Sequence, residues 1–219
     1  MVNKLNFDSI LVVISSPSGA GKTSLANSIV EEYQSISFST SVTTRPPRDG
    51  EKNGREYYFT TKEKFDLMIK RGEFIEYAEV FGNFYGTQKG KTEELLNNGQ
   101  DIIFDVDWQG GTKIRNSYLA PSVISIFILP PSIKTLQERL LTRNKDDNKT
   151  VKLRMKEARS EISHWSEYDY ILVNNNFEKV KKNIIKIIEI EKIKRNRQNY
   201  LPDFISKLNN EFDDFINKN

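Results

Sequence analysis

The chain has 219 residues, a length that suits a single domain with one hydrophobic core. Its 37% of hydrophobic and 29% of charged residues exclude a disordered tail protein and a membrane bundle, and its net charge of +3 suits small anionic ligands as well as nucleic acid. It has no cysteine and one histidine, His164, which excludes disulfides, thiolate catalysis and structural zinc and leaves little room for a Ser-His-Asp triad.

The N-terminal segment, residues 1–9, lacks the basic stretch followed by an apolar one that marks a secretory signal. No apolar run approaches the roughly 20 residues needed to span a bilayer. We therefore expect a cytoplasmic protein without a membrane partner.

An apolar, β-branched run at 10–15 (ILVVIS) predicts a buried parallel strand, and the segment 22–33 has helical spacing at Leu25, Ile29 and Val30. Similar strand-like runs follow at 101–107, 122–129 and 168–174, with helical patterns between or after them. This alternation predicts an α/β fold in which a parallel sheet is flanked by helices.

Two stretches interrupt the alternation. Residues 41–97 combine a turn-rich segment, a helix and a mixed polar and aromatic segment, which indicates a small inserted α+β lobe with antiparallel strands. Residues 131–165 are charged and helical, as in a mobile lid. The core of the single domain would then consist of residues 1–40, 98–130 and 166–200.

Residues 201–219 form a C-terminal helical extension that follows a long amphipathic helix. Its apolar stripe contains Phe204, Leu208, Phe212 and Phe215. The stripe would pack either on the body of the protein or on a second subunit, and the sequence leaves both open. We accordingly expect a monomer or a homodimer.

The turn after the first strand reads SSPSGAGKTS (15–24) and nearly matches the phosphate-binding pattern Gly-x-x-x-x-Gly-Lys-[Ser/Thr]. In that pattern backbone N–H groups cradle phosphates, the lysine adds charge, and the Ser or Thr hydroxyl holds Mg²⁺. Lys22 and Thr23 are present, but Ser16 replaces the first glycine. Serine there costs little if its φ is negative and about 1 kcal/mol if it is positive. The alternative is an ordinary helix-capping turn that contains a lysine.

The loop between this strand and this helix predicts a parallel sheet of the P-loop NTPase type. The candidate ATP-binding residues are those of the loop and the first helical turn: Ser16, Pro17, Ser18, Gly19, Ala20, Gly21, Lys22, Thr23 and Ser24.

A second group of candidate phosphate ligands lies in TTRPPRDGEKNGREYYF (43–59). Arg45 and Arg48 flank a rigid Pro-Pro turn, and Tyr57 follows. Two guanidinium groups can fork onto one phosphate, and a tyrosine hydroxyl can add a donor. The alternative is a basic loop on a solvated face.

These stretches, together with GEFIEYAEVFGNFYGT (72–87), DIIFDVDWQG (101–110) and ARSEISHWSEYDYILVN (158–174), occur in the order and spacing of guanylate kinases, which the chain resembles over residues 9–195. The most specific match is Thr-Thr-Arg-x-x-Arg-x-Gly-Glu-x-x-Gly-x-x-Tyr. The resemblance implies transfer of the γ-phosphoryl group of ATP to GMP or dGMP, as in purine nucleotide recycling. It also implies a GMP-binding lobe at 41–97, a closing lid, and ATP with Mg²⁺ as cofactors.

On matching positions, the resemblance implies several contacts to GMP. The residues that would grip its phosphate are Arg45, Arg48, Tyr57 and Tyr85, and those that would contact the guanine are Ser41, Glu76 and Thr87. Chemistry supports Glu76 independently, because a carboxylate accepts from guanine N1–H and the 2-amino group but repels the lone pair at adenine N1. The alternative for Glu76 is a surface glutamate in a strand.

Asp105 and Asp107 are two residues apart at the end of a predicted buried strand, so they face the same side. They resemble the family's paired acids, which face the nucleotides and the water shell of Mg²⁺. The resemblance thus implies that both aspartates belong to the GMP site. It also implies that Thr23 is a ligand of Mg²⁺ and that Asp107 contacts the ion through water.

The predicted lid carries arginines that would meet phosphate charge when it closes. Arg139 and Arg143 are four residues apart on one helix face, and Arg154 occupies the family's arginine position. With Lys22 they are the candidate catalytic residues, and solvated ion pairs are the alternative for the arginines. We interpret His164 as structural, since phosphoryl transfer needs no histidine base.

The sequence leaves two other functions to consider. A non-catalytic guanylate-kinase-like interaction module would keep the fold but usually has a damaged phosphate loop, whereas this chain keeps Lys22 and Thr23. Nucleic-acid binding by the basic tail lacks an aromatic stacking motif. We therefore expect small-molecule substrates and no nucleic acid.

Overall fold

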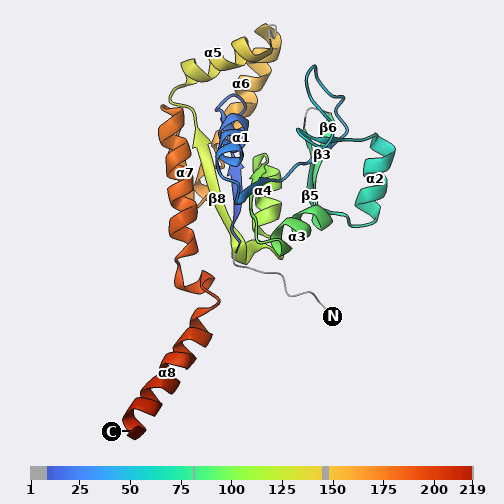
Figure 1. The fold of residues 1–219 in the computed structure, drawn as a ribbon. Coiled ribbons are helices and arrows are strands. Elements are labelled where there is room, and N and C mark those ends of the chain that lie inside the picture. Colours follow the sequence, from blue (N-terminus) through green and yellow to red (C-terminus); the bar gives the residue numbers. More distant parts are fainter. Residues whose placement is uncertain (1–8, 81, 145–147, 219) are drawn as a thin grey trace.

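The computed structural model describes residues 9–80, 82–144 and 148–218. Within these ranges the chain forms a five-stranded sheet and a four-stranded sheet. Figure 1 shows helices on both faces of the larger sheet, the smaller sheet beside it, and a long C-terminal helix that projects away from the body.

The larger sheet is the centre of the core, and its strand pairs are all parallel. In spatial order its strands are β2 (Ile36–Phe38), β7 (Asp101–Asp105), β1 (Leu11–Ser15), β8 (Val123–Leu129) and β9 (Tyr170–Val173). The helices that cover it are α1 (Lys22–Glu32), α3 (Lys89–Asn97), α4 (Trp108–Arg115) and α7 (Phe177–Lys192).

Alternate residues of β1 enter two hydrophobic clusters on opposite faces of this sheet. Val12 and Ile14 pack with residues of α1 and α7, whereas Leu11 and Val13 pack with residues of α3 and α4. Burial on both faces explains why the strands are continuous apolar runs rather than alternating ones. The predicted fold class, a parallel sheet flanked by helices, is confirmed.

The smaller sheet and one helix form the inserted lobe. Its strands, in spatial order, are β4 (Tyr58–Phe59), β3 (Val42–Thr43), β6 (Asn83–Gln88) and β5 (Phe74–Val80), and the helix is α2 (Lys62–Lys70). Phe65 of α2 is fully buried and stacks on Phe74 of β5, with ring centroids 4.6 Å apart. The β5–β6 and β3–β6 pairs are antiparallel, as expected for an inserted lobe.

Two helices, α5 (Ile133–Asn144) and α6 (Asn148–Ile162), follow β8 in the segment that the sequence assigns to a lid. Leu136 and Leu140 of α5 form a small cluster with Ala158 of α6. Leu140 also lies against the phosphate loop, because a Cβ atom at Gly19 would meet its Cδ2 at 3.1 Å.

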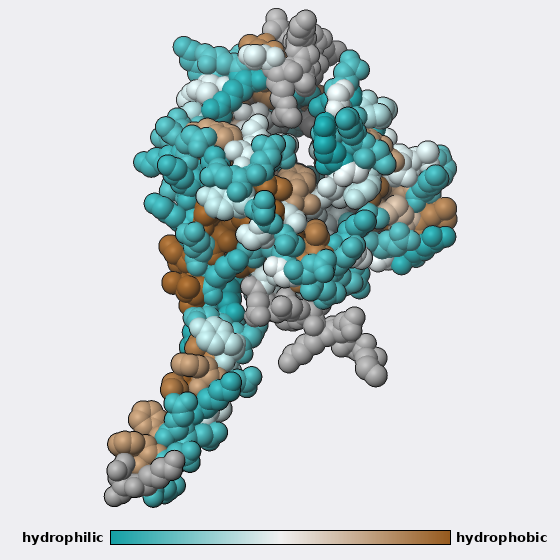
Figure 2. All heavy atoms as spheres, in the orientation of Figure 1, coloured by the Kyte–Doolittle hydropathy of each residue, from teal (hydrophilic) through white to brown (hydrophobic). Residues whose placement is uncertain are grey.

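Helix α8 (Leu201–Lys218) continues beyond the core after α7. Figure 2 shows apolar side chains gathered along it, and Phe212 and Phe215 are 64% and 67% exposed. No helix in the described part of the chain is long and apolar enough to cross a bilayer. Short 3-10 helices lie at Ala120–Ser122, Trp165–Glu167 and Arg195–Arg197.

His164 has a packing role in this fold. Its ring stacks on Trp108, the first residue of α4, with centroids 3.7 Å apart and an interplanar angle of 9°. Its Nδ1 lies 2.5 Å from Glu167 Oε1. The stacking joins the segment after α6 to the first turn of α4.

Candidate active site

The phosphate loop joins β1 to α1 where the core strands end. Ile14 of β1 is paired with Asp105 of β7, so the loop and the end of β7 lie side by side. Gly19 and Gly21 have φ angles of 89° and 98°, in the left-handed region that favours glycine. A Cβ atom at Gly21 would approach Asn174 Nδ2 to 2.7 Å. The turn therefore depends on its glycines, and α1 begins directly after it with its unpaired N–H groups at the loop.

Ser16 lies directly after β1 and is buried. Its hydroxyl donates to Pro17 O at 3.0 Å, and Ala20 N–H donates to the same carbonyl at 3.1 Å. Serine at this position thus has a hydrogen-bond partner inside the loop.

Lys22 joins the loop to the end of β7. Its Nζ donates to Val106 O at 2.9 Å and forms an ion pair with Asp105. The side chains of Lys22 and Asp105 are 16% and 8% exposed, so this charge pair is largely shielded from water. Asp105 also acts at a distance. The pKa of Tyr57 is raised to about 12, mainly by burial and next by the charge of Asp105.

Asp107 directly precedes α4, where its Oδ1 accepts from Gly110 N–H at 2.8 Å and caps the helix. Its charge acts on two other carboxyl groups. Burial is the largest cause of the raised pKa of Glu76 in the inserted lobe and of Glu161 in α6, and the charge of Asp107 raises both further. The charge of Asp107 therefore acts on one carboxyl group of the lobe and one of the lid.

A cavity of about 500 Å³ opens beside the loop. Its lining residues are Gly19, Gly21, Thr23, Ser24, Asn27, Arg139, Asn174, Asn175 and Phe177. Arg139 of α5 donates to Ala20 O at 3.2 Å and to Asn174 O at 3.4 Å, while Asn174 Nδ2 donates to Ala20 O at 2.8 Å. The lid helix α5 and the residue after β9 thus both contact the loop.

The inserted lobe brings Arg45, Tyr57 and Tyr85 together. The Arg45 guanidinium lies 5.3 Å from the Tyr57 ring centroid, and the Tyr57 and Tyr85 rings meet edge to face at 5.8 Å. Arg45 Nη2 also donates to both oxygens of Glu51, at 2.8 and 2.9 Å, which holds the pKa of Glu51 below its usual value. The side chain of Arg48 is exposed, and its backbone N–H donates to Glu51 Oε2 at 2.8 Å.

Glu76 of β5 is 5% exposed, and its Oε1 accepts from the hydroxyl of Thr87 on β6 at 2.7 Å. Burial, together with the charge of Asp107, raises the pKa of Glu76 to about 7. The carboxyl also faces α4, since a Cβ atom at Gly110 would meet Glu76 Oε2 at 2.9 Å. Ser41 precedes β3, where its carbonyl accepts from Tyr58 N–H at 2.9 Å.

The predicted lid arginines differ in where they lie. Arg139 is at the loop, as described above. Arg154 is half-buried on α6. The side chain of Arg143, near the end of α5, lies outside the described residues.

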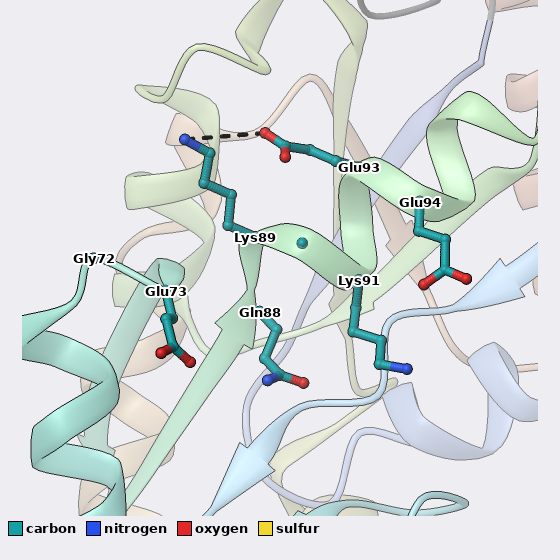
Figure 3. A pocket seen from close by; sticks show the side chains of 8 residues that line it. Gly72, Glu73, Gln88, Lys89, Lys91, Glu93 and Glu94 are labelled. Atoms are coloured by element: carbon teal, nitrogen blue, oxygen red, sulfur yellow. Dashed lines mark ion pairs between the residues drawn. The ribbon is translucent and has the colours of Figure 1, made fainter. Parts of the chain in front are cut away.

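A second hollow of about 500 Å³ lies between the α2–β5 turn and the start of α3. Figure 3 shows its lysines and glutamates spread around an open space, with one ion pair between Lys89 and Glu93 at 4.0 Å. It contains none of the predicted site residues.

Three residues at the site were not singled out from the sequence: Glu51, Asn174 and Glu161. Glu51 belongs to the quoted Arg-rich stretch, and its spacing from Arg45 across the turn could have indicated an ion pair. Asn174 directly follows a predicted core strand, a position typical of ligand sites in α/β sheets. Glu161 of α6 accepts from Ser18 N–H at 3.0 Å, a contact across 143 positions with no local signal.

Comparisons with known proteins agree with this geometry. The family model described as guanylate kinase matches residues 8–191. A guanylate kinase of Cereibacter sphaeroides is 48% identical over 204 residues, covering 93% of this chain and 97% of that protein. One of Ruegeria pomeroyi is 45% identical over 205 residues, covering 94% and 96%. The crystal structure of guanylate kinase from Anaplasma phagocytophilum matches with a TM-score of 0.76 at 38% identity, covering 90% of this chain and 93% of that one.

Proposed function

The chain belongs to the guanylate kinase family, and we propose that its phosphate loop binds ATP while its four-stranded sheet binds GMP. It is a nucleoside monophosphate kinase, which transfers the γ-phosphoryl group of ATP to GMP to give ADP and GDP. A non-catalytic interaction module is not favoured, because relatives named guanylate kinase align over nearly the whole chain.

One observation carries the proposed arrangement. Asp105 pairs with Lys22 of the loop, and its charge also reaches Tyr57 of the inserted lobe. One largely shielded carboxylate thus pairs with the loop and acts electrostatically on the lobe, which supports a centre between them where a phosphoryl group can pass from one nucleotide to the other. Coupled detection of ADP, with purified protein, Mg·ATP and GMP, tests the proposal.

For ATP, we propose that the loop N–H groups and Lys22 hold the β and γ phosphates. The adenosine would lie in the cavity beside the loop, where Asn27, Asn174 and Asn175 offer polar groups and Phe177 an apolar surface. Arg139 lines the same cavity and would meet phosphate charge on lid closure.

For GMP or dGMP, we propose that Arg45, Arg48, Tyr57 and Tyr85 bind the phosphate. Glu51 neutralises Arg45 in the structure, so the phosphate would replace one anionic partner of the guanidinium by another. The guanine would be read by Glu76 with Thr87 and Ser41. The short bond between Thr87 and Glu76 supports this role, since it fixes the carboxylate at a buried position where unmatched bases are costly.

The transfer step needs positioning and charge neutralisation rather than a protein nucleophile. We propose that Lys22, Arg139, Arg143 and Arg154 neutralise charge on the phosphoryl group, while Asp105 and Asp107 orient the loop lysine and the acceptor side of the site.

Mg²⁺ is expected to arrive with ATP. The described residues contain no group of three or more His, Cys, Asp or Glu side chains able to hold a metal alone. A sparse set of oxygen donors suits Mg²⁺, which keeps several waters and takes one or two protein groups besides phosphates. Thr23 would hold it directly and Asp107 through water, and the ion would neutralise charge on the β and γ phosphates.

GMP binding is expected to weaken as the pH falls below about 7, because only the ionised carboxyl of Glu76 can accept from both guanine donors and its pKa lies at about 7. Affinity should fall toward tenfold per pH unit below that value. The raised pKa has the opposite effect on the protein without ligand. Its stability falls as the pH rises from 4.5 to about 7, because Glu76 is then ionised in the unfolded chain but still protonated in the folded protein.

Calorimetric titration with GMP from pH 5.5 to 8 measures this dependence. Glu76→Gln is the control, because the phosphate of GMP titrates equally in both proteins. Equal pH slopes for the two proteins would exclude an ionised Glu76 from guanine binding.

We further propose that the protein acts in the cytoplasm on small-molecule substrates, without a nucleic-acid or membrane partner, as a monomer or a homodimer. The exposed apolar side chains of α8 are the surface on which a homodimer would form.

A further inference from the structure

Glu161 lies in the last turn of the lid helix α6, and its carboxylate reaches into the phosphate loop. Its Oε2 accepts from Ser18 N–H at 3.0 Å. This N–H belongs to the set of loop amides that, in a phosphate-binding loop, face an anion. A side-chain carboxylate from the lid therefore takes the place of an anionic oxygen on the loop.

One cation and two carboxylates act on Glu161. The charge of Lys22 acts on it favourably, whereas Asp107 and Glu157 oppose its ionisation. Burial and these two carboxylates raise its pKa, and the Ser18 N–H and Lys22 only partly offset them. The carboxyl is thus held at the loop by a hydrogen bond in surroundings that disfavour its charge.

We propose that Glu161 is a further residue of the ATP site, which competes with the terminal phosphates of ATP for the Ser18 end of the loop and is displaced when ATP binds. This inference rests on the proposed use of the loop for ATP. A carboxylate and a phosphate oxygen cannot share one N–H without strong repulsion, because both are anionic and the site is shielded from water.

Displacement of Glu161 would also act on the lid. Arg154 precedes Glu161 by seven residues, about two helical turns, so both lie on nearly the same face of α6 about 10 Å apart. Release of Glu161 would free the end of α6 and let the helix shift with Arg154 toward the phosphates. Glu161 is therefore a positioning residue, which couples occupation of the loop to movement of the lid.

The test is the affinity of the full chain for a non-hydrolysable ATP analogue with Mg²⁺, measured by calorimetry for the wild type and for Glu161→Gln. The amide keeps the shape of the side chain but removes the competing charge. We expect the dissociation constant to fall at least threefold and the KM for ATP to fall with it, while affinity for GMP stays unchanged.

Glu157→Gln is the matched control, because it removes the same charge one turn away on the same helix. Since the charge of Glu157 opposes the ionisation of Glu161, its removal should leave the affinity for the analogue unchanged or lower it, and should not raise it. Unchanged or weaker analogue binding by Glu161→Gln overturns the proposal. Equal gains in affinity for both variants also overturn it, because the gain would then come from the net charge of α6 rather than from the contact of Glu161 with Ser18. Glu161→Ala removes the acceptor altogether and repeats the test, so tighter binding of the analogue is again expected. The affinity for GMP shows whether each variant is folded. If the wild type itself failed to bind the analogue, the proposed function would fall together with this inference.

Discussion

Glu76→Gln is expected to lower kcat/KM for GMP by about two orders of magnitude while the affinity for ATP stays within about twofold. The carboxylate is buried and held by Thr87, so it cannot turn away from the base. Glutamine would direct an NH₂ group at the N1–H or 2-amino donors of guanine and leave a buried donor unmatched. Such a mismatch costs about 2–4 kcal/mol, and each 1.4 kcal/mol corresponds to a factor of ten.

Steady-state kinetics with GMP, together with calorimetry of the ATP analogue, measure the two effects separately. Glu79→Gln is the matched control, because Glu79 lies on the same strand, β5, but is exposed. It should leave both parameters close to those of the wild type. Equal losses toward GMP and ATP in Glu76→Gln would contradict the guanine-reading role.

Lys22→Ala is expected to lower kcat by about 10²- to 10³-fold, the usual effect of removing one preorganised charge donor from a transition state. The lysine lies at the loop, shielded from water by its pairing with Asp105, where electrostatic interactions are strong. Its loss also leaves the Asp105 carboxylate buried and unpaired, so we expect a lower melting temperature as well.

The two effects can be separated. In the double variant Lys22→Ala with Asp105→Asn the melting temperature should recover, because the unpaired charge is removed, whereas kcat should not. Lys64→Ala, at an exposed position of α2, controls for the loss of positive charge in general. Near wild-type turnover by Lys22→Ala would show that the proposed ATP site is wrong.

The core of the fold could be predicted because its signals are local. The apolar run at 122–129 corresponds to β8 (Val123–Leu129), and the glycines of the loop have the left-handed angles that only glycine adopts readily. Strand, loop and helix follow one another within about 20 residues, and each carries its own pattern. For the same reason, the antiparallel strands of the inserted lobe could be predicted in kind but not in order, since pairing of β3 with β6 depends on contacts across 40 positions.

The candidate site could be predicted as a set of residues but not as a set of contacts. The motifs assigned Arg45 and Lys22 to phosphate and Asp105 to the site, but they did not indicate that Arg45 pairs with Glu51 or Lys22 with Asp105. The contacts of Glu161 with Ser18, and of Asn174 with Ala20, join segments more than 140 residues apart. They follow from the packing of α6 and of the end of β9 against the loop, which no spacing within the sequence encodes.

The most direct test of the account is the coupled kinase assay of the purified protein with Mg·ATP across nucleoside monophosphates. We expect rapid use of GMP, slower use of dGMP, and a kcat/KM for AMP or UMP lower by several orders of magnitude, because a buried carboxylate at Glu76 matches the donors of guanine and repels N1 of adenine. Comparable turnover of AMP and GMP would contradict the reading of guanine by Glu76 and with it the central claim.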